Sequence, residues 1–306
     1  MSSPEEKRIF TIGEVVYDIM FKQGQPVAAK PGGAMLNSAI SLGRSGLPVS
    51  FTGTCGNDKT GELISAFLNE NHVDTSFLHH EASQSIIALA FLDENNNASY
   101  SFYRGLNPPE LPMLPSTGPL DILLFGSFYS ISPPTMKAVL SLRKSAAEKG
   151  TLLFYDPNFR SSHLGELEKV KPFIRDHIGH SHIVRGSDED FGIIFGTKTA
   201  ESTWELPCFK NCSALIYTRS SYGVDLCTPR FCNHYPVPGI TPLSTIGAGD
   251  SFNAGVIAAI FENNIGSMNI ASCTPEQWEI IIAKGTRFAT DVCMSYDNYI
   301  PWPELI

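Results

Sequence analysis

The sequence predicts an α/β fold with a mostly parallel sheet and a small β subdomain beside it. Apolar segments of strand length alternate with amphipathic segments of helix length through most of the 306 residues, and this rhythm is typical of a parallel sheet covered by helices. Two hairpins, near residues 14–31 and 84–106, interrupt the alternation without a helix between their strands. These interruptions are the reason to expect a second, smaller β unit.

Composition narrows the class of protein. A chain of 306 residues with 42% hydrophobic residues suits one large globular unit, with or without a subdomain. The net charge of −9 without a Lys/Arg cluster argues against nucleic acid as a partner. The N-terminal residues have no apolar signal core, and no apolar run reaches the roughly 18 residues of a membrane helix. We therefore expect a cytoplasmic protein without a membrane partner.

Cysteine usage agrees with a reducing compartment. The seven cysteines are odd in number and scattered, so we expect reduced thiols. The group with the closest spacing, Cys208, Cys212, Cys227, Cys232 and His234, contains residue types that can bind zinc. The spacings are wider than those of tight zinc-binding pairs, and burial as small apolar side chains is the preferred interpretation.

The first elements are a strand, a hairpin and a helix. Residues 8–13 form an apolar strand, and the hairpin that follows contains Asp18 within an apolar run. Asp is disfavoured in strands, so Asp18 lies either on an exposed face or in a cleft. Gly32 and Gly33 then open a helix with one apolar face. Asn37, one turn inside this helix, either binds a polyol hydroxyl or faces solvent.

The next elements repeat the α/β rhythm and then depart from it. A strand over residues 48–56 precedes a helix over residues 58–69. The second hairpin pairs residues 85–92 with residues 99–103, and Arg104 follows it directly. An Arg at this position either clamps an anion or a sugar hydroxyl, or lies on the surface.

Polar residues follow the buried strands of the second half. Strands are expected at residues 121–126, 152–156, 182–185 and 214–218, and helices at 133–149, 191–195 and 274–291. Asp156, Asn158 and Arg160 stand at or just after a strand end, where open α/β sheets bind ligands. The acidic residues 188–190 follow another strand. They either hold Mg²⁺ through water or cap the next helix, and their spacing favours the cap.

A small-residue segment before the apolar run 256–261 is the most informative stretch. Gly247, Ala248 and Gly249 leave their backbone N–H groups open to a ligand, and Asp250 follows in the first turn of a helix. A helix N-terminus of this kind binds anions, for example phosphate. A carboxylate beside a phosphate site suits a base that takes a proton from an attacking hydroxyl. The segment is not a nucleophile elbow, since Asn253 replaces the final Gly. Residues 53–60 resemble a Walker A loop but are not one, because Asp58 stands where the Gly before Lys59 would be.

Two glycine-rich elements, about 210 residues apart, together resemble the ribokinase-like (PfkB) sugar kinase family. Gly32, Gly33 and Asn37 resemble its N-terminal signature, and residues 245–255 resemble its C-terminal one. The resemblance covers nearly the whole chain. It implies a doubly wound α/β core (residues 1–13, 32–83 and 107–306) and a β lid (residues 14–31 and 84–106).

Within the family the chain is most similar to fructokinases. The shared stretches are Glu14 with Asp18, residues 101–104, 126–127, 156–160 and 187–190. Tyr103, Arg104 and Arg160 also resemble sugar-contacting positions of 2-keto-3-deoxygluconate kinases. The resemblance therefore leaves the sugar open.

The resemblance implies a role for each site residue. Asp250 would be the base, and the amides of Gly247, Ala248 and Gly249 would form the anion hole. The sugar would be held by Asp18, Gly32, Gly33, Asn37, Tyr103, Arg104, Asn158 and Arg160. ATP would lie near Ser187, Asp190, Thr218, Gly223 and Gly249, with Asp190 as a possible Mg²⁺ partner through water. Many members of the family carry an Asp that binds a monovalent cation where this chain has Ser244, which weakens the expectation of K⁺.

The sequence thus predicts an ATP- and Mg²⁺-dependent sugar kinase, with fructose as the first choice of substrate. 2-Keto-3-deoxygluconate kinase and ribokinase are the alternatives within the class, and the family also suggests a homodimer formed through the lid. A different class of function is a non-catalytic sugar-binding sensor on a kinase fold. A dinucleotide-dependent oxidoreductase ranks last, because no Gly-x-Gly-x-x-Gly follows the first strand.

Overall fold

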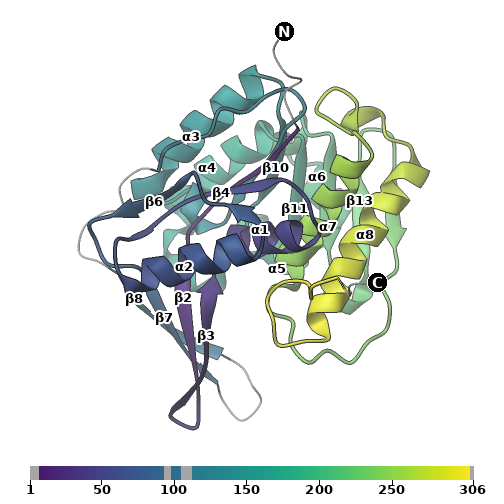
Figure 1. The fold of residues 1–306 in the computed structure, drawn as a ribbon. Coiled ribbons are helices and arrows are strands. Elements are labelled where there is room, and N and C mark those ends of the chain that lie inside the picture. The colour runs from purple at the N-terminus through teal and green to yellow at the C-terminus, as the bar shows by residue number, and fades with distance from the viewer. Residues whose placement is uncertain (1–6, 93–97, 105–111, 304–306) are drawn as a thin grey trace.

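One large sheet forms the centre of the molecule (Figure 1). The computed structural model describes residues 7–92, 98–104 and 112–303. The strand order of the large sheet is β14-β13-β12-β11-β10-β9-β1-β4-β5, with β6 also paired to β4. All of these pairs are parallel except β12–β13 and β13–β14. The strands are β1 (Ile9–Ile12), β4 (Val49–Gly56), β5 (Val73–Asp74), β6 (Leu78–Glu81), β9 (Ile122–Gly126), β10 (Leu152–Asp156), β11 (Ile183–Ser187), β12 (Ala214–Thr218), β13 (Val224–Cys227) and β14 (Cys232–Tyr235).

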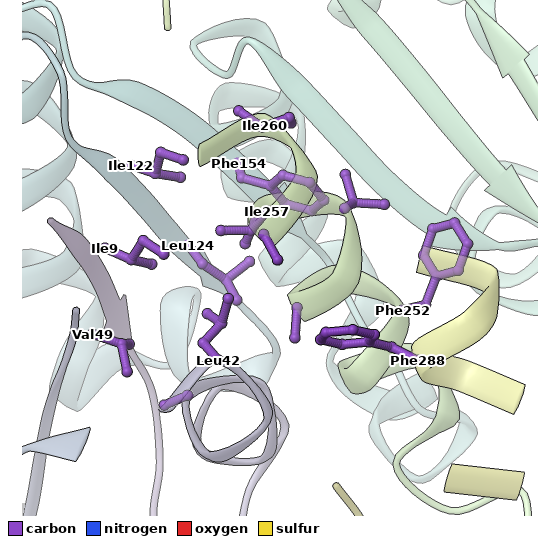
Figure 2. Packing of buried hydrophobic residues seen from close by; sticks show 14 of the residues in the cluster. Ile9, Leu42, Val49, Ile122, Leu124, Phe154, Phe252, Ile257, Ile260 and Phe288 are labelled. Carbon is purple, nitrogen blue, oxygen red and sulfur yellow. The ribbon is translucent and has the colours of Figure 1, made fainter. Parts of the chain in front are cut away.

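Helices cover both faces of this sheet. One face packs against α1 (Ala34–Arg44), α2 (Lys59–Glu70), α7 (Ala248–Glu262) and α8 (Pro275–Cys293). The other face packs against α3 (Pro133–Glu148), α4 (Leu167–Gly179), α5 (Asp188–Phe195) and α6 (Ala200–Trp204). Adjacent strand residues serve opposite faces, so Phe154 joins the first layer and Tyr155 the second. Figure 2 shows Ile257 and Ile260 of α7 packed over Phe154 and Leu124 in the first layer. The doubly wound α/β prediction is confirmed.

The two expected hairpins join into one four-stranded sheet. Its strands are β2 (Val16–Lys22), β3 (Gln25–Gly32), β7 (Ile87–Leu92) and β8 (Ala98–Tyr103), in the order β3-β2-β7-β8. The two hairpins are antiparallel, and β2 pairs with β7 in parallel. In Figure 1 this small sheet projects from the lower edge of the molecule. The exact boundaries between core and lid stay a prediction.

Side-chain caps explain where several helices begin. Asp58 accepts a hydrogen bond from the Gly61 N–H at 2.8 Å and starts α2. Thr274 forms a capping box with Gln277 at the start of α8. The short strands β5 and β6 and the helices α4 and α6 were not indicated by the sequence pattern. Short 3₁₀ helices lie at Phe128–Ser130, Ser161–Glu166, Pro207–Phe209, Ser220–Tyr222 and Ile270–Ser272. None of the helices in the described ranges is long and apolar enough to span a bilayer.

The expectation of reduced thiols is wrong for two of the seven cysteines. Cys227 and Cys232 form a disulfide across the β13–β14 hairpin, where they face each other in the strand register with Cα atoms 4.1 Å apart. This pairing depends on the register of the hairpin, which cysteine spacing alone does not reveal. Five thiols are free: Cys55, Cys208, Cys212, Cys273 and Cys293.

Candidate active site

The candidate site lies at the carboxyl ends of the parallel strands. After β1, the next strands of the large sheet, β4 and β5, are added on one side of β1. The later strands β9, β10, β11 and β12 are added in order on the other side of β1. The strand order therefore reverses between β1 and β9, which is where open α/β sheets bind ligands. Asp156, Ser187 and Thr218 end three neighbouring strands at this edge. The first strand of the small sheet, β2, follows the carboxyl end of β1 after three residues. The small sheet therefore begins at the same edge of the large sheet.

The first turn of α7 presents its backbone N–H groups at this edge. Gly247 precedes the helix in the left-handed conformation, with φ 78°. The first intrahelical bond is Ser251 N–H to Gly247 O at 2.8 Å, so the amides of Gly249 and Asp250 lie ahead of it. The Ala248 amide donates to Thr245 O at 3.3 Å, so it already has a local partner. Free amides and the helix dipole make this turn suited to an anion.

Asp250 is buried at the start of α7, with 8% of its surface exposed. Its Oδ2 accepts a hydrogen bond from Asn37 Nδ2 at 2.9 Å. Its Oδ1 accepts none from the described residues. Burial raises the pKa of Asp250 to about 6, and the Asn37 bond and the charge of Arg160 oppose that rise. A carboxylate with a free oxygen and a pKa near neutrality suits a general base.

Asn37 has one buried atom that is not hydrogen-bonded. The side chain is 5% exposed, and its Oδ1 accepts no hydrogen bond although its Nδ2 donates to Asp250. Buried polar atoms are nearly always paired, so an unpaired one at a ligand site fits a missing donor. A ligand hydroxyl would supply that donor. Asn37 therefore lies against Asp250 and does not face solvent.

Two glycines at the junction of β3 and α1 pack closely against residues of the first hairpin segment. A Cβ on Gly32 would lie 2.1 Å from Asp18 Oδ2, and one on Gly33 would lie 2.3 Å from Glu14 O. Position 33 requires glycine, because its neighbour is a backbone carbonyl and its φ is 135°. The contact at Gly32 is with the end of a side chain, which could move aside. Burial raises the pKa of Asp18 to about 6, and the charge of Lys30 opposes that rise. Asp18 is thus a partly buried carboxyl group beside Gly32, two residues before the start of α1.

Arg160, another predicted sugar residue, acts on Asp250 through its charge and not through a hydrogen bond. Its exposed side chain lowers the pKa of Asp250 through its charge, and it forms no hydrogen bond with described residues. Arg104 instead forms an ion pair with Glu14. Asn158 has φ 38°, and its N–H donates to Asp156 Oδ1 at 2.9 Å, so its visible role is a turn. Tyr103 is 60% exposed at the end of β8.

The predicted nucleotide side has a cavity next to it. Gly223 has φ 101°, and a Cβ there would lie 2.6 Å from both the His234 ring and Tyr235 O. Directly beyond Tyr235 lies a cavity of about 400 Å³ between the end of β14 and α8. Its lining is Tyr235, Pro236, Pro238, Glu279, Ile282, Ala283, Thr286, Arg287 and Thr290.

Asp190 is engaged as a cap. Its Oδ2 accepts hydrogen bonds from the Ser187 N–H at 2.8 Å and from Ser187 Oγ at 2.6 Å, which completes a capping box for α5. Its Oδ1 accepts from the Phe159 N–H at 2.8 Å. The side chain is 5% exposed, and no cluster of metal-ligating residues occurs in the part of the chain that the structure describes. These contacts do not fit a Mg²⁺ ion bound directly by Asp190, while the preferred capping interpretation fits.

Arg185 lies beside the first turn of α7, although the sequence pattern does not indicate it. It is 8% exposed, its Nη1 pairs with the fully buried Asp156 Oδ2 at 3.1 Å, and its Nη2 donates to Thr218 Oγ1 at 2.8 Å. A Cβ on Gly249 would lie 2.9 Å from Nη1, so the guanidinium is packed against the first turn of α7. Asn253 also donates to Asp156, at 2.6 Å. The charge of Arg185 within an otherwise apolar strand is the sequence feature that could have indicated a buried, paired arginine.

A family model and several named proteins align with most of this chain. Residues 6–302 match the family model described as pfkB family carbohydrate kinase. The chain is 26% identical over 281 residues to a probable fructokinase-3 of Arabidopsis thaliana, covering 86% of this chain and 80% of that protein. It is 28% identical over 285 residues to a fructokinase of Rhizobium leguminosarum bv. trifolii, covering 88% and 84%.

Solved structures share the fold. A fructokinase of Vibrio cholerae O395, in a form with bound fructose, ADP and calcium ion, aligns with TM-score 0.83 at 19% identity, over 95% of this chain and 94% of that one. An aminoimidazole riboside kinase of Salmonella enterica, complexed with aminoimidazole riboside and an ATP analogue, aligns with TM-score 0.82 at 21% identity, over 97% and 98%. With the match of the family model over residues 6–302, the chain belongs to the pfkB family of carbohydrate kinases.

Proposed function

We propose that this kinase transfers the γ-phosphoryl group of ATP to a primary hydroxyl of fructose, giving fructose 6-phosphate and ADP. The carrying observation is the position of Asp250: buried, bonded by Asn37 through one oxygen, and placed in the helix turn with free amides. The names of the relatives support fructose, because several of them are fructokinases. At 26–28% identity these names alone do not decide the sugar.

The proposed step needs one base and one anion site. The sugar oxygen attacks the γ-phosphorus, the new O–P bond forms as the bond to the β-phosphate oxygen breaks, and the hydroxyl proton passes to Asp250 Oδ1. The amides of Gly247 and Gly249 would stabilise the charge on the transferred phosphoryl oxygens. The Ala248 amide would join them only by giving up its bond to Thr245 O. Holding both reactants in line supplies much of the remaining acceleration.

The sugar would lie between the small sheet and the first turns of α1 and α7. Asn37 Oδ1 would accept a hydrogen bond from a sugar hydroxyl, which satisfies its otherwise unpaired atom. Asp18, beside Gly32, would form one wall, and Arg160, whose charge lowers the pKa of Asp250, would form another. Gly33, Tyr103, Arg104 and Asn158 stay proposed sugar residues.

ATP would extend from the α7 turn along β12 toward α8. Thr218, Gly223 and Gly249 would flank its phosphates, and the cavity beyond Tyr235 has room for its base. Ser187 and Asp190 would support this side through the cap of α5. Mg²⁺ is expected to accompany ATP, and no residue is assigned to it. K⁺ dependence stays open, with Ser244 as the reason to expect none.

The small sheet would serve as a lid and as the surface of a homodimer. It exposes large apolar side chains, namely Val27 (56%), Phe91 (43%), Phe102 (52%) and Tyr103 (60%), and such exposure is typical of an interface. We expect sedimentation equilibrium to give twice the monomer mass of 33.4 kDa. The variant Phe102→Ser should weaken the dimer, whereas Leu164→Ser, at a similarly exposed site outside this sheet, should not. A wild-type monomer at micromolar concentration would contradict the dimer.

Coupled ADP release with MgATP tests the substrate. The panel is fructose, ribose, 2-keto-3-deoxygluconate, tagatose and adenosine, with the Asp250→Asn protein as the blank. We expect the highest kcat/KM on fructose. Higher turnover on another sugar would keep the kinase activity and reject fructose. Sugar binding with no ADP release on any member would favour the sensor function.

A further inference from the structure

One lysine of the small sheet reaches into the core. Lys30 lies on β3, where most neighbouring side chains are exposed, yet its own side chain is only 13% exposed. Its Nζ donates to Tyr296 O at 2.9 Å and lies 3.6 Å from Asp297 Oδ1. Both partners belong to segment 295–300, which follows α8 and is drawn in yellow in Figure 1. Lys30 is therefore a direct tie between the small sheet and the core.

Segment 295–300 packs against the anion-binding turn. A Cβ on Gly247 would lie 2.2 Å from Asn298 O and 2.7 Å from Asn298 Cα, so the two backbones are in contact. The Ile300 N–H donates to Ser41 Oγ at 3.3 Å, and Ser41 Oγ lies 3.0 Å from Ser251 Oγ in the first turn of α7. A shift of this segment would therefore move the turn that carries Gly247.

Lys30 also faces the sugar side. It pairs with Asp18 across β2 and β3, and the charge of each affects the pKa of the other. The charged groups around its ammonium are Asp18, Asp297 and Arg44. Burial lowers the pKa of Lys30, and the two carboxylates oppose that decrease. An ammonium between these carboxylates links a proposed sugar residue to the segment beside the anion hole.

We propose that Lys30 is a positioning residue that couples sugar binding to the geometry of the anion-binding turn. The inference rests on the proposed function. When the sugar fixes Asp18 and the small sheet, Lys30 holds segment 295–300 against Gly247, and the amides of the α7 turn stay aligned for phosphate. Coupling of this kind is reciprocal, so the nucleotide tightens sugar binding by the same factor.

Calorimetry with the non-hydrolysable analogue AMP-PNP, with and without fructose, tests the coupling. In the wild type we expect fructose to tighten AMP-PNP binding by about fivefold or more. In Lys30→Met we expect a factor close to one, a kcat about tenfold lower, and an affinity for AMP-PNP alone that falls by no more than about threefold. Lys30→Arg should recover part of the coupling, because it keeps the charge. A merely structural lysine would lower stability without changing the coupling factor.

Lys284→Met is the matched control. Lys284 is also mostly buried, at 20% exposure, and it pairs with Glu262 between α7 and α8. Its loss should leave the coupling factor within twofold of the wild type. Full coupling in Lys30→Met, or equal loss in both variants, would overturn the inference. So would a wild type that turns over fructose but shows no coupling.

Amide exchange separates this inference from the proposed function. Peptides that cover residues 244–256 should exchange faster in Lys30→Met than in the wild type without any ligand, and this readout needs no turnover. If no sugar is phosphorylated but the exchange difference is present, the proposed function is rejected and the role of Lys30 in holding segment 295–300 is kept. If sugars are phosphorylated but exchange is unchanged, only the role of Lys30 is rejected.

Discussion

Replacing Asp250 by Asn is expected to lower kcat by about 10³-fold, within the range that a general base contributes. The amide cannot accept the hydroxyl proton, although it fills the same volume and keeps a hydrogen bond with Asn37. Calorimetry should show AMP-PNP affinity within twofold of the wild type, because the anion site consists of backbone amides. Asp74→Asn, at a carboxylate on β5 that bonds only Ser50 and Ser76 in the described structure, is the control. Turnover within a few-fold of the wild type would reject Asp250 as the base.

The pH profile provides a second measurement on the same residue. Because burial raises the pKa of Asp250 to about 6, kcat/KM should fall about tenfold per pH unit below 6. The effect on stability has the opposite direction. A folded pKa above the unfolded value of 3.8 means that the native state binds more protons between about pH 4 and 6. The contribution of Asp250 to stability therefore falls as pH rises through that range. We expect Asp250→Asn to melt at or above the wild-type temperature at pH 7.

Replacing Gly247 by Ala is expected to reduce kcat by about 10²-fold, as the loss of one oxyanion donor does elsewhere. The substitution has two costs: φ is 78°, and the new Cβ would lie 2.2 Å from Asn298 O. To relieve the contact, either the turn at Gly247 or segment 295–300 must move. Either movement would displace the backbone amides at the start of α7. Steady-state kinetics measures the loss of kcat, and urea unfolding of the same protein measures the loss of stability.

Gly46→Ala separates backbone strain from crowding. Gly46 has φ 79°, nearly the same as Gly247, but nothing lies within 4 Å of its Cβ position. This variant should lose about 1 kcal/mol of stability from the left-handed conformation alone and keep kcat within twofold. If Gly46→Ala lowered kcat as much as Gly247→Ala, crowding at Asn298 would not explain the effect.

Local pattern was sufficient for much of the fold. Periodicity located α1, α2, α3 and α8, because each has one apolar face and a recognisable start, such as Asp58 or Thr274. Apolar runs located β9, β10 and β12, because these strands are buried on both faces. The turn at Gly247 was readable because three small residues before a carboxylate are unusual.

Contacts between distant parts of the chain were beyond that reasoning. Asn37 and Asp250 are 213 residues apart, and only the family resemblance assigned both to one site. The hydrogen bond between them was not predicted. Asn37 by itself was compatible with a solvent face. Arg185 was seen as part of a strand, but its partners Asp156 and Thr218 come from the two neighbouring strands. The Cys227–Cys232 disulfide likewise requires the two cysteines to face each other in the β13–β14 register. Composition gives no information about that register.

The parallel pairing of β2 with β7 has a consequence for how the protein is made. Tyr17 lies opposite Ile87, and the 69 residues between them belong mostly to the large sheet and its helices. Closing that long connection is entropically unfavourable until the intervening chain is compact. We expect each hairpin to form early and the complete four-stranded sheet to form late, after the chain has emerged from the ribosome well past residue 103. A nascent chain stopped before that point would hold a folded first hairpin with an unpaired edge, which is a surface for chaperones or for aggregation.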